Sequence, residues 1–133
     1  MRKIGDMKKG IGPKLHPSVL DIAWAAGILE GEGSFGCTKS KAHNSGYSAS
    51  GRVTAVQKGE WLMERLRDLF GGSIYTRENP GLGKGPVTRW MLCGPRARGL
   101  MMTIYTFMSP RRKKTIKDIL QGKFKAKGQK GES

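Results

Sequence analysis

Apolar residues follow a helical spacing in two segments of the N-terminal half. Residues 19–29 (VLDIAWAAGIL) predict a helix that ends at Gly31 and Gly33, with Ser18 as its N-cap and Asp21 three residues later forming an imperfect capping box. Residues 60–70 (EWLMERLRDLF) repeat the helical spacing and end at a pair of glycines, which is typical of a helix C-terminus.

Between and after these helices, apolar and polar residues alternate, which indicates half-buried strands. The predicted strands are residues 34–41, 50–57, 73–78 and 87–93. Two more helices follow, over 94–108 and, after Pro110, over 111–120. The order α-β-β-α-β-β-α, with an extra C-terminal helix, places two helix–hairpin units over one four-stranded antiparallel sheet, which is an α+β fold.

The chain of 133 residues has the length of one domain and carries 25 Lys and Arg against 10 Asp and Glu, a formal charge of +15. Residues 1–14 and 121–133 are glycine-rich and basic, and we expect them to be flexible arms. They hold nine of the basic and two of the acidic residues, so the predicted domain, residues 15–120, keeps +8. A basic domain favours a polyanionic partner, with nucleic acid ahead of a membrane.

Several classes of protein are excluded by pattern. Cys37 and Cys93 are the only cysteines and match no disulfide framework or zinc spacing. The longest apolar run, residues 22–29, is too short to span a bilayer, and no secretion signal is present. The glycine pattern at 31–36 follows a helix instead of a strand, so no nucleotide cofactor is expected. We expect a soluble protein of a reducing intracellular compartment.

Residues 25–35 (AAGILEGEGSF) break several rules for a helix end. Glu30 and Glu32 lie where the helix dipole disfavours negative charge, and Gly27 lies inside the helix. Such conflicts concentrate at functional sites. Ala23, Gly27 and Gly31 recur every four residues, which leaves one helix face almost without side chains and lets a second helix approach closely.

Two such helices, packed together, would bring two carboxylates face to face at the rim of a basic sheet. Paired carboxylates bind hard divalent cations, most simply Mg²⁺. A cation held against a phosphate chain indicates phosphodiester hydrolysis. For Glu30, capping or interface hydrogen bonding is favoured over metal binding.

The segment AAGILEGEGSF resembles the LAGLIDADG motif of homing endonucleases, in register from Ala26 to Gly33. The resemblance extends over most of residues 18–120, because the predicted element order is that of the family. It implies the homing-endonuclease fold: a four-stranded antiparallel DNA-binding saddle with the motif helix at a dimer interface. Two residues depart from the motif, Ala25 in place of leucine and Glu32 in place of aspartate.

The resemblance also implies roles for individual residues. Glu32 matches the acidic metal ligand, and Gly31 matches a position whose carbonyl completes the coordination. Gln57 matches a residue that orders the hydrolytic water. Arg111, or failing that Lys113, matches a basic residue that polarises this water and steadies the phosphate.

The chain contains one copy of the motif, so the resemblance implies a homodimer that binds a pseudo-palindromic target. The expected interface residues are Ala23, Ala26, Gly27 and Glu30. The expected DNA contacts are Thr38, Ser40, Arg52, Thr54, Lys58, Arg77, Lys84 and Arg89, with Thr76 or Glu78 as alternatives to Arg77.

The function that the resemblance implies is site-specific, Mg²⁺-dependent cleavage of double-stranded DNA by an intron-encoded, mobile homing endonuclease, with Mn²⁺ able to replace Mg²⁺. Its compartment would be a bacterial or phage-infected cytoplasm, or an organelle. Two alternatives stay open: an inactive protein of the same fold, acting as an RNA maturase or a DNA-binding regulator, and a basic RNA-binding accessory protein.

Overall fold

The computed structural model describes residues 12–42, 46–78 and 85–123, and for residues 38–42 and 46–49 we describe the backbone alone. The elements are α1 (Val19–Glu32), β1 (Gly33–Ala42), β2 (Gly46–Lys58), α2 (Trp61–Phe70), β3 (Ser73–Arg77), β4 (Val87–Cys93), α3 (Pro95–Ile104), the 3₁₀ turn η1 (Tyr105–Phe107) and α4 (Pro110–Leu120). The predicted order and the α+β class are confirmed.

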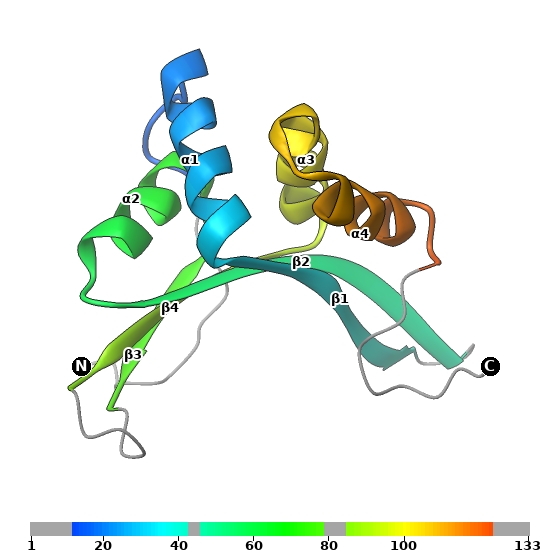
Figure 1. The fold of residues 1–133 in the computed structure, drawn as a ribbon. Coiled ribbons are helices and arrows are strands. Elements are labelled where there is room, and N and C mark those ends of the chain that lie inside the picture. The colour runs from blue at the N-terminus through cyan, green and yellow to red at the C-terminus, as the bar shows by residue number, and fades with distance from the viewer. Residues whose placement is uncertain (1–11, 43–45, 79–84, 124–133) are drawn as a thin grey trace.

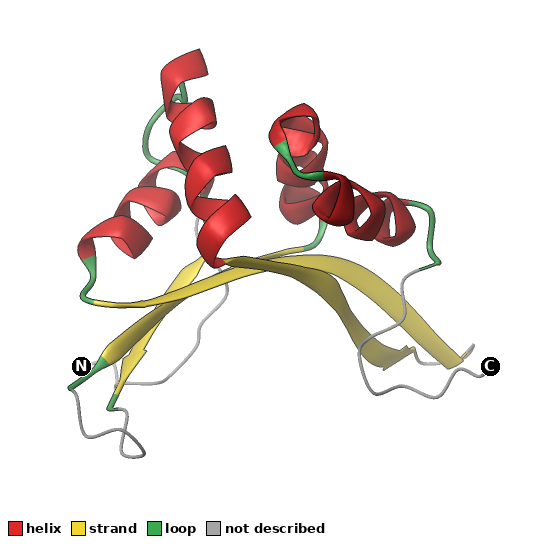
Figure 2. Ribbon diagram, viewed as in Figure 1, coloured by secondary structure: helices red, strands yellow, loops and turns green. Residues whose placement is uncertain are grey.

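The four strands form one antiparallel sheet in the order β1-β2-β4-β3. The helices all lie on one face of this curved sheet, and its other face carries no helix among the described residues (Figures 1 and 2). The sheet face under the helices carries the apolar half of each alternating strand, including Phe35, Val53, Trp90 and Leu92, all buried. The helices cover this face with their own apolar residues, such as Leu29, Leu66, Met101 and Ile116.

Helix α1 begins and ends where the sequence predicts. The Ser18 side chain accepts a hydrogen bond from the Asp21 N–H, and the Asp21 carboxylate accepts one from the Ser18 N–H, so the capping box is present. The helix continues through Gly31 to Glu32, and its C-cap is Gly33, so it ends at the two glycines as predicted. Contacts from α4, described below, hold this last turn in helical form.

The predicted helix over residues 94–108 is divided in the structure. Its α-helical part ends at Ile104, and Tyr105–Phe107 continue as a 3₁₀ turn. Met108 is extended and buried, which lets Ser109 act as the N-cap of α4 with Pro110 in its first turn. Burial of Met108 therefore separates the two helices.

The corner between α2 and β3 is formed by two glycines with positive φ, Gly71 and Gly72. The indole N–H of Trp90, which is fully buried, donates a 2.8 Å hydrogen bond to the Gly71 carbonyl. At Gly72, with φ of 104°, an added Cβ would lie 2.5 Å from the Met91 carbonyl oxygen and 2.9 Å from the Trp90 Nε1. Only glycine fits here without moving the backbone.

We therefore expect Gly72→Ala to lower the free energy of unfolding by about 3 kcal/mol, from left-handed strain plus steric overlap. The matched control is Gly59→Ala, because Gly59 also has a positive φ of 84° but an added Cβ there meets nothing within 4 Å. The control should lose only about 1 kcal/mol. Urea denaturation of both variants measures the difference; equal losses would show that the contact with Trp90 and Met91 does not matter.

Candidate functional site

The last residue of α1, Glu32, is exposed. It has no hydrogen-bond or ion-pair partner among the residues that the structure describes. The next residue, Gly33, starts β1 and pairs with Ala55 of β2, so Glu32 lies at the junction of the helix layer and the sheet. A carboxylate in this position is not used to hold the fold and is free to bind a ligand.

Glu30, two residues earlier, is in a different situation. Its Oε1 accepts a 3.0 Å hydrogen bond from the Ser109 N–H, and its carbonyl oxygen accepts one of 3.0 Å from Arg112 Nη2. The hydrogen bond from the Ser109 backbone lowers the pKa of Glu30. The structure therefore gives Glu30 hydrogen-bond partners within the chain itself. A role in a dimer interface, the other expectation for Glu30, stays a prediction.

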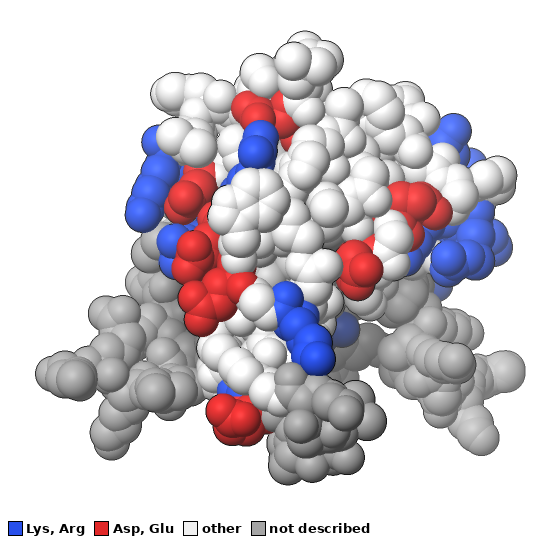
Figure 3. Space-filling view, turned by 60° about the vertical axis from the view of Figure 1, so that its left-hand side comes forward, with Lys and Arg blue, Asp and Glu red and all other residues white. Residues whose placement is uncertain are grey.

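The exposed side of α1 carries a stripe of Val19, Leu20, Ala23, Gly27 and Gly31, which we call the α1 stripe. Leu20 is 81% exposed, and a Cβ added to Gly27 or Gly31 would meet nothing within 4 Å. Ala26, the other expected interface residue, is 2% exposed and packs in the core of its own subunit, so it does not belong to this surface. Figure 3, with the α1 and α2 side turned forward, shows a broad uncharged area between charged side chains.

The helix-free face of the sheet carries the expected nucleic-acid contacts. Alternation and register place seven of the eight expected positions on this face: Thr38, Ser40, Arg52, Thr54, Lys58, Arg77 and Arg89. Thr76, one alternative to Arg77, lies on the opposite face, where its hydroxyl is 3.1 Å from that of Thr88. Tyr75, which pairs with Arg89, shares the free face and was missed by the sequence analysis. Lys84 lies outside the described residues.

The charge of this face is uniform. Among the strand positions that the register assigns to it, Arg52, Lys58, Arg77 and Arg89 are basic and none is Asp or Glu. The concave side of the saddle in Figure 1 is therefore the surface best suited to a polyanion.

Gln57, the expected water-ordering residue, is half-buried near the end of β2 and pairs with Thr88. By strand alternation, Gln57 lies on the same sheet face as Ala55, the face covered by the helices, and Val56 lies on the other face. Because Ala55 is the partner of Gly33, Gln57 stands two residues past the point where α1 enters the sheet, about 7 Å along the strand. This places its backbone beside the end of α1.

The basic residues of α4 are distributed differently from the expectation. Arg111 is exposed, and the Lys113 ammonium lies 5.6 Å from the Tyr105 ring centre. The residue that reaches the end of α1 is Arg112, which the sequence analysis missed. The helical spacing of the sequence could have indicated this. Arg112 lies one helical turn before Ile116, a core residue, and so falls on the inward face of α4.

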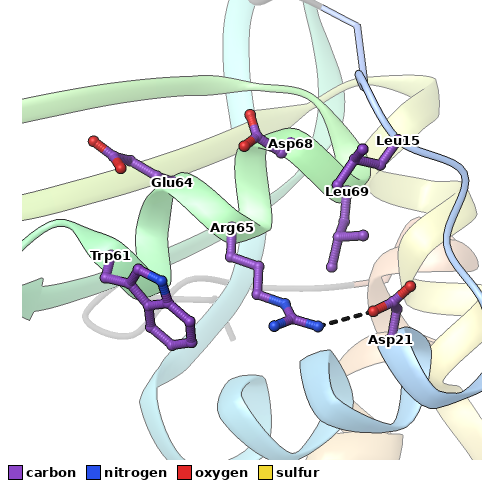
Figure 4. A pocket seen from close by; sticks show the side chains of 7 residues that line it. All are labelled: Leu15, Asp21, Trp61, Glu64, Arg65, Asp68 and Leu69. Atoms are coloured by element: carbon purple, nitrogen blue, oxygen red, sulfur yellow. Dashed lines mark hydrogen bonds and ion pairs between the residues drawn. The ribbon is translucent and has the colours of Figure 1, made fainter.

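A pocket of about 430 Å³ lies between α1 and α2, lined in part by Asp21, Trp61 and Arg65 (Figure 4). Arg65 donates a 2.9 Å hydrogen bond to Asp21 and lies over the Trp24 ring, 4.5 Å from its centre. Hydrogen bonds from Ser18 lower the pKa of Asp21. Since Asp21 is eleven residues before Glu32, about 16 Å along the helix, this pocket is separate from the Glu32 end.

The donor set at Glu32 fits half of a cation site. Within the described ranges, no group of three or more His, Cys, Asp and Glu side chains could hold a metal ion. One free carboxylate suits Mg²⁺, which is commonly bound by one or two carboxylates together with substrate phosphates and water. The described part of the chain therefore supplies one ligand, and a complete cation site would need further ligands.

No family model matches the sequence, and no curated protein matches it. The structure matches homing endonucleases. The match to I-CvuI, in a complex with its target, covers 78% of this chain and 70% of that chain, with a TM-score of 0.54 and 15% sequence identity. The match to the intron-encoded I-CeuI, in a complex with DNA, covers 80% of this chain and 56% of that chain, with a TM-score of 0.54 and 19% sequence identity.

A third match is the LAGLIDADG homing endonuclease I-LtrWI bound to target DNA, with a TM-score of 0.58 and 15% identity over 76% of this chain and 35% of that chain. The chain therefore has the fold of the LAGLIDADG homing endonucleases. None of the helices in the described part of the chain is long and apolar enough to cross a membrane.

Proposed function

We propose that the chain is one subunit of a homodimeric, divalent-metal-dependent endonuclease that cleaves double-stranded DNA at a specific, pseudo-palindromic site. The observation that carries this proposal is the free Glu32 carboxylate, held at the junction between the α1 stripe and a basic, helix-free sheet face. The similar structures of I-CvuI, I-CeuI and I-LtrWI contain DNA, which supports DNA as the polyanion.

The proposed cation site needs Glu32 from both subunits, together with the Gly31 carbonyl oxygens. Mg²⁺ is the proposed cofactor, with Mn²⁺ as a substitute. Structures of I-CvuI with DNA were obtained with Mg²⁺, where the DNA is not cleaved, and with Ca²⁺. When bound, the cation would supply stabilisation of negative charge on the phosphate oxygens. In this proposal Gln57 holds the attacking water, and Arg111 or Lys113 contacts the phosphate.

Glu32→Gln should reduce cleavage by at least about 100-fold, because the amide is a poor ligand for a hard cation. Since the target is unknown, the protein is incubated with a randomised double-stranded DNA library and Mg²⁺, and the new ends are sequenced. Glu64→Gln is the matched control, because it removes a carboxylate from α2 without touching the site.

Cuts that recur with the wild type and with Glu64→Gln, and disappear with Glu32→Gln while DNA binding is retained, are the expected result. DNA binding without cuts, in Mg²⁺ and in Mn²⁺, would contradict the endonuclease and leave a binding protein of the same fold.

The homodimer is supported by the α1 stripe, which is apolar, exposed and free of bulky side chains at its centre. The matched region makes up 70% of the I-CvuI chain but only 35% of the I-LtrWI chain. The longer I-LtrWI chain is therefore long enough to contain two such units, whereas I-CvuI is long enough for one. In the proposed dimer, the Gly27 positions of two subunits allow close approach of the helix backbones.

Gly27→Leu should weaken dimerisation at least tenfold, because the added side chain separates the helices, by the close-packing argument that applies to small-residue helix pairs. The folded subunit should tolerate it, since the position is open and leucine favours a helix. Gly99→Leu, at an equally open glycine of α3, is the control. Analytical ultracentrifugation at several concentrations, with and without DNA, measures both; equal dimerisation of the two variants would argue against this interface.

Arg89→Ala should weaken binding to the target DNA by about 1–3 kcal/mol, because the side chain lies on the proposed DNA face. Lys117→Ala removes an equally exposed charge from α4, on the opposite side of the sheet, and should change binding little. Binding isotherms in Ca²⁺ at fixed salt compare the two. If Lys117→Ala lost more DNA-binding free energy than Arg89→Ala, the result would contradict a DNA site on the helix-free face of the sheet.

A further inference from the structure

The C-terminal end of α1 concentrates negative charge that no residue of the helix's own last turn neutralises. Its last turn contains Glu30 and Glu32 and no basic residue. The final carbonyl groups of a helix also have no N–H partner within the helix and carry partial negative charge. A structure that keeps both acids in helical form therefore needs donors from elsewhere.

These donors come from the start of α4. The Ser109 N–H donates to the Glu30 carboxylate at 3.0 Å, and Arg112 Nη2 donates to the Glu30 carbonyl oxygen at 3.0 Å. Ser109 is the N-cap of α4, so the Glu30 carboxylate lies at the positive end of that helix. We call these three residues the Glu30 clamp.

The same guanidinium also contacts the chain after Glu32. The Arg112 Cζ lies 5.5 Å from the centre of the Phe35 ring, which is buried in the core. Arg112 therefore holds the backbone two residues before Glu32 and a core side chain three residues after it. Its Nε is buried without a hydrogen-bond partner in the described part of the protein, a cost that accompanies this fixed placement.

The clamp leaves the Glu32 carboxylate itself free. The segment from Gly31 to Gly33 contains two glycines and would be the easiest part of the helix to unwind. Fixing the residues on both sides of this segment restricts where the Gly31 carbonyl and the Glu32 carboxylate can point.

The structure assigns Arg112 the role of a positioning residue that sets the cation affinity of Glu32 by holding the end of α1 against α4. This role rests on the proposed endonuclease function. It differs from the roles given to Arg111 and Lys113, because Arg112 acts through Glu30 and Phe35 and does not contact the substrate.

The test compares wild type, Arg112→Gln, Arg112→Lys and the control Lys114→Gln. Lys114 is an exposed cation of the same helix whose partner among the described residues is Asp118 one turn later, so the control removes the same charge without touching α1. Two quantities are measured in the full chain. One is the Mg²⁺ concentration for half-maximal cleavage, and the other is the amide hydrogen-exchange rate of residues 31–33 without metal or DNA.

Arg112→Gln should raise the half-maximal Mg²⁺ concentration about tenfold, as is typical for residues that orient metal ligands, and should accelerate exchange at residues 31–33. Arg112→Lys keeps the charge but not the planar guanidinium, so it should restore only part of both properties. Lys114→Gln should match the wild type. If Arg112→Gln does not fold, Arg112→Lys decides the question.

Faster exchange with an unchanged Mg²⁺ requirement would overturn the proposal, since Arg112 would then be structural only. The proposal would also be overturned if Arg112→Gln had the same exchange rates and the same Mg²⁺ requirement as Lys114→Gln. Absence of cleavage by the wild type would instead contradict the endonuclease function, while the exchange rates would still show whether Arg112 holds this helix end.

Discussion

The contact between the end of α1 and the start of α4 is the interaction on which the arrangement of this protein depends. Without the Ser109 N–H and the Arg112 guanidinium, two glutamates and two glycines would have to end a helix against its dipole. With them, α1 continues to Glu32 and passes directly into β1 at Gly33. The edge of the sheet and the free carboxylate are thereby fixed relative to each other.

Helix α1 is also unusual in having small or apolar residues on most of its circumference. Ala25, Ala26 and Leu29 pack into the core, while Leu20, Ala23 and Gly27 are exposed. A helix that is apolar all round is ordinarily buried on all sides. The chain by itself leaves one side of α1 exposed, and this is the side that the proposed homodimer would cover. The same chemistry explains the error at Ala26, since a sequence with small residues on every side does not indicate which side faces the core.

The strands were predictable because their alternation is strong. In β2, buried Val53 and Ala55 alternate with Arg52 and Thr54, so the sequence alone predicts which side chains share the free face. The role of Arg112 was harder to predict, because it depends on α4 meeting α1 from a distant part of the chain. The same contact supports the helical form of α1 through Gly31 to Glu32, because glycine disfavours a helix at this position.

The distribution of charge connects these features. Along the sheet, the free face is basic, whereas Glu32 places a negative charge at the point where that face meets the α1 stripe. A bare carboxylate beside a phosphate chain is repulsive, and two of them across a dimer axis would be more so. A divalent cation reverses the sign of this interaction. The basic face therefore suits a polyanion in general, and in the proposed dimer a metal ion at Glu32 would be needed before a phosphate chain could approach the two carboxylates closely.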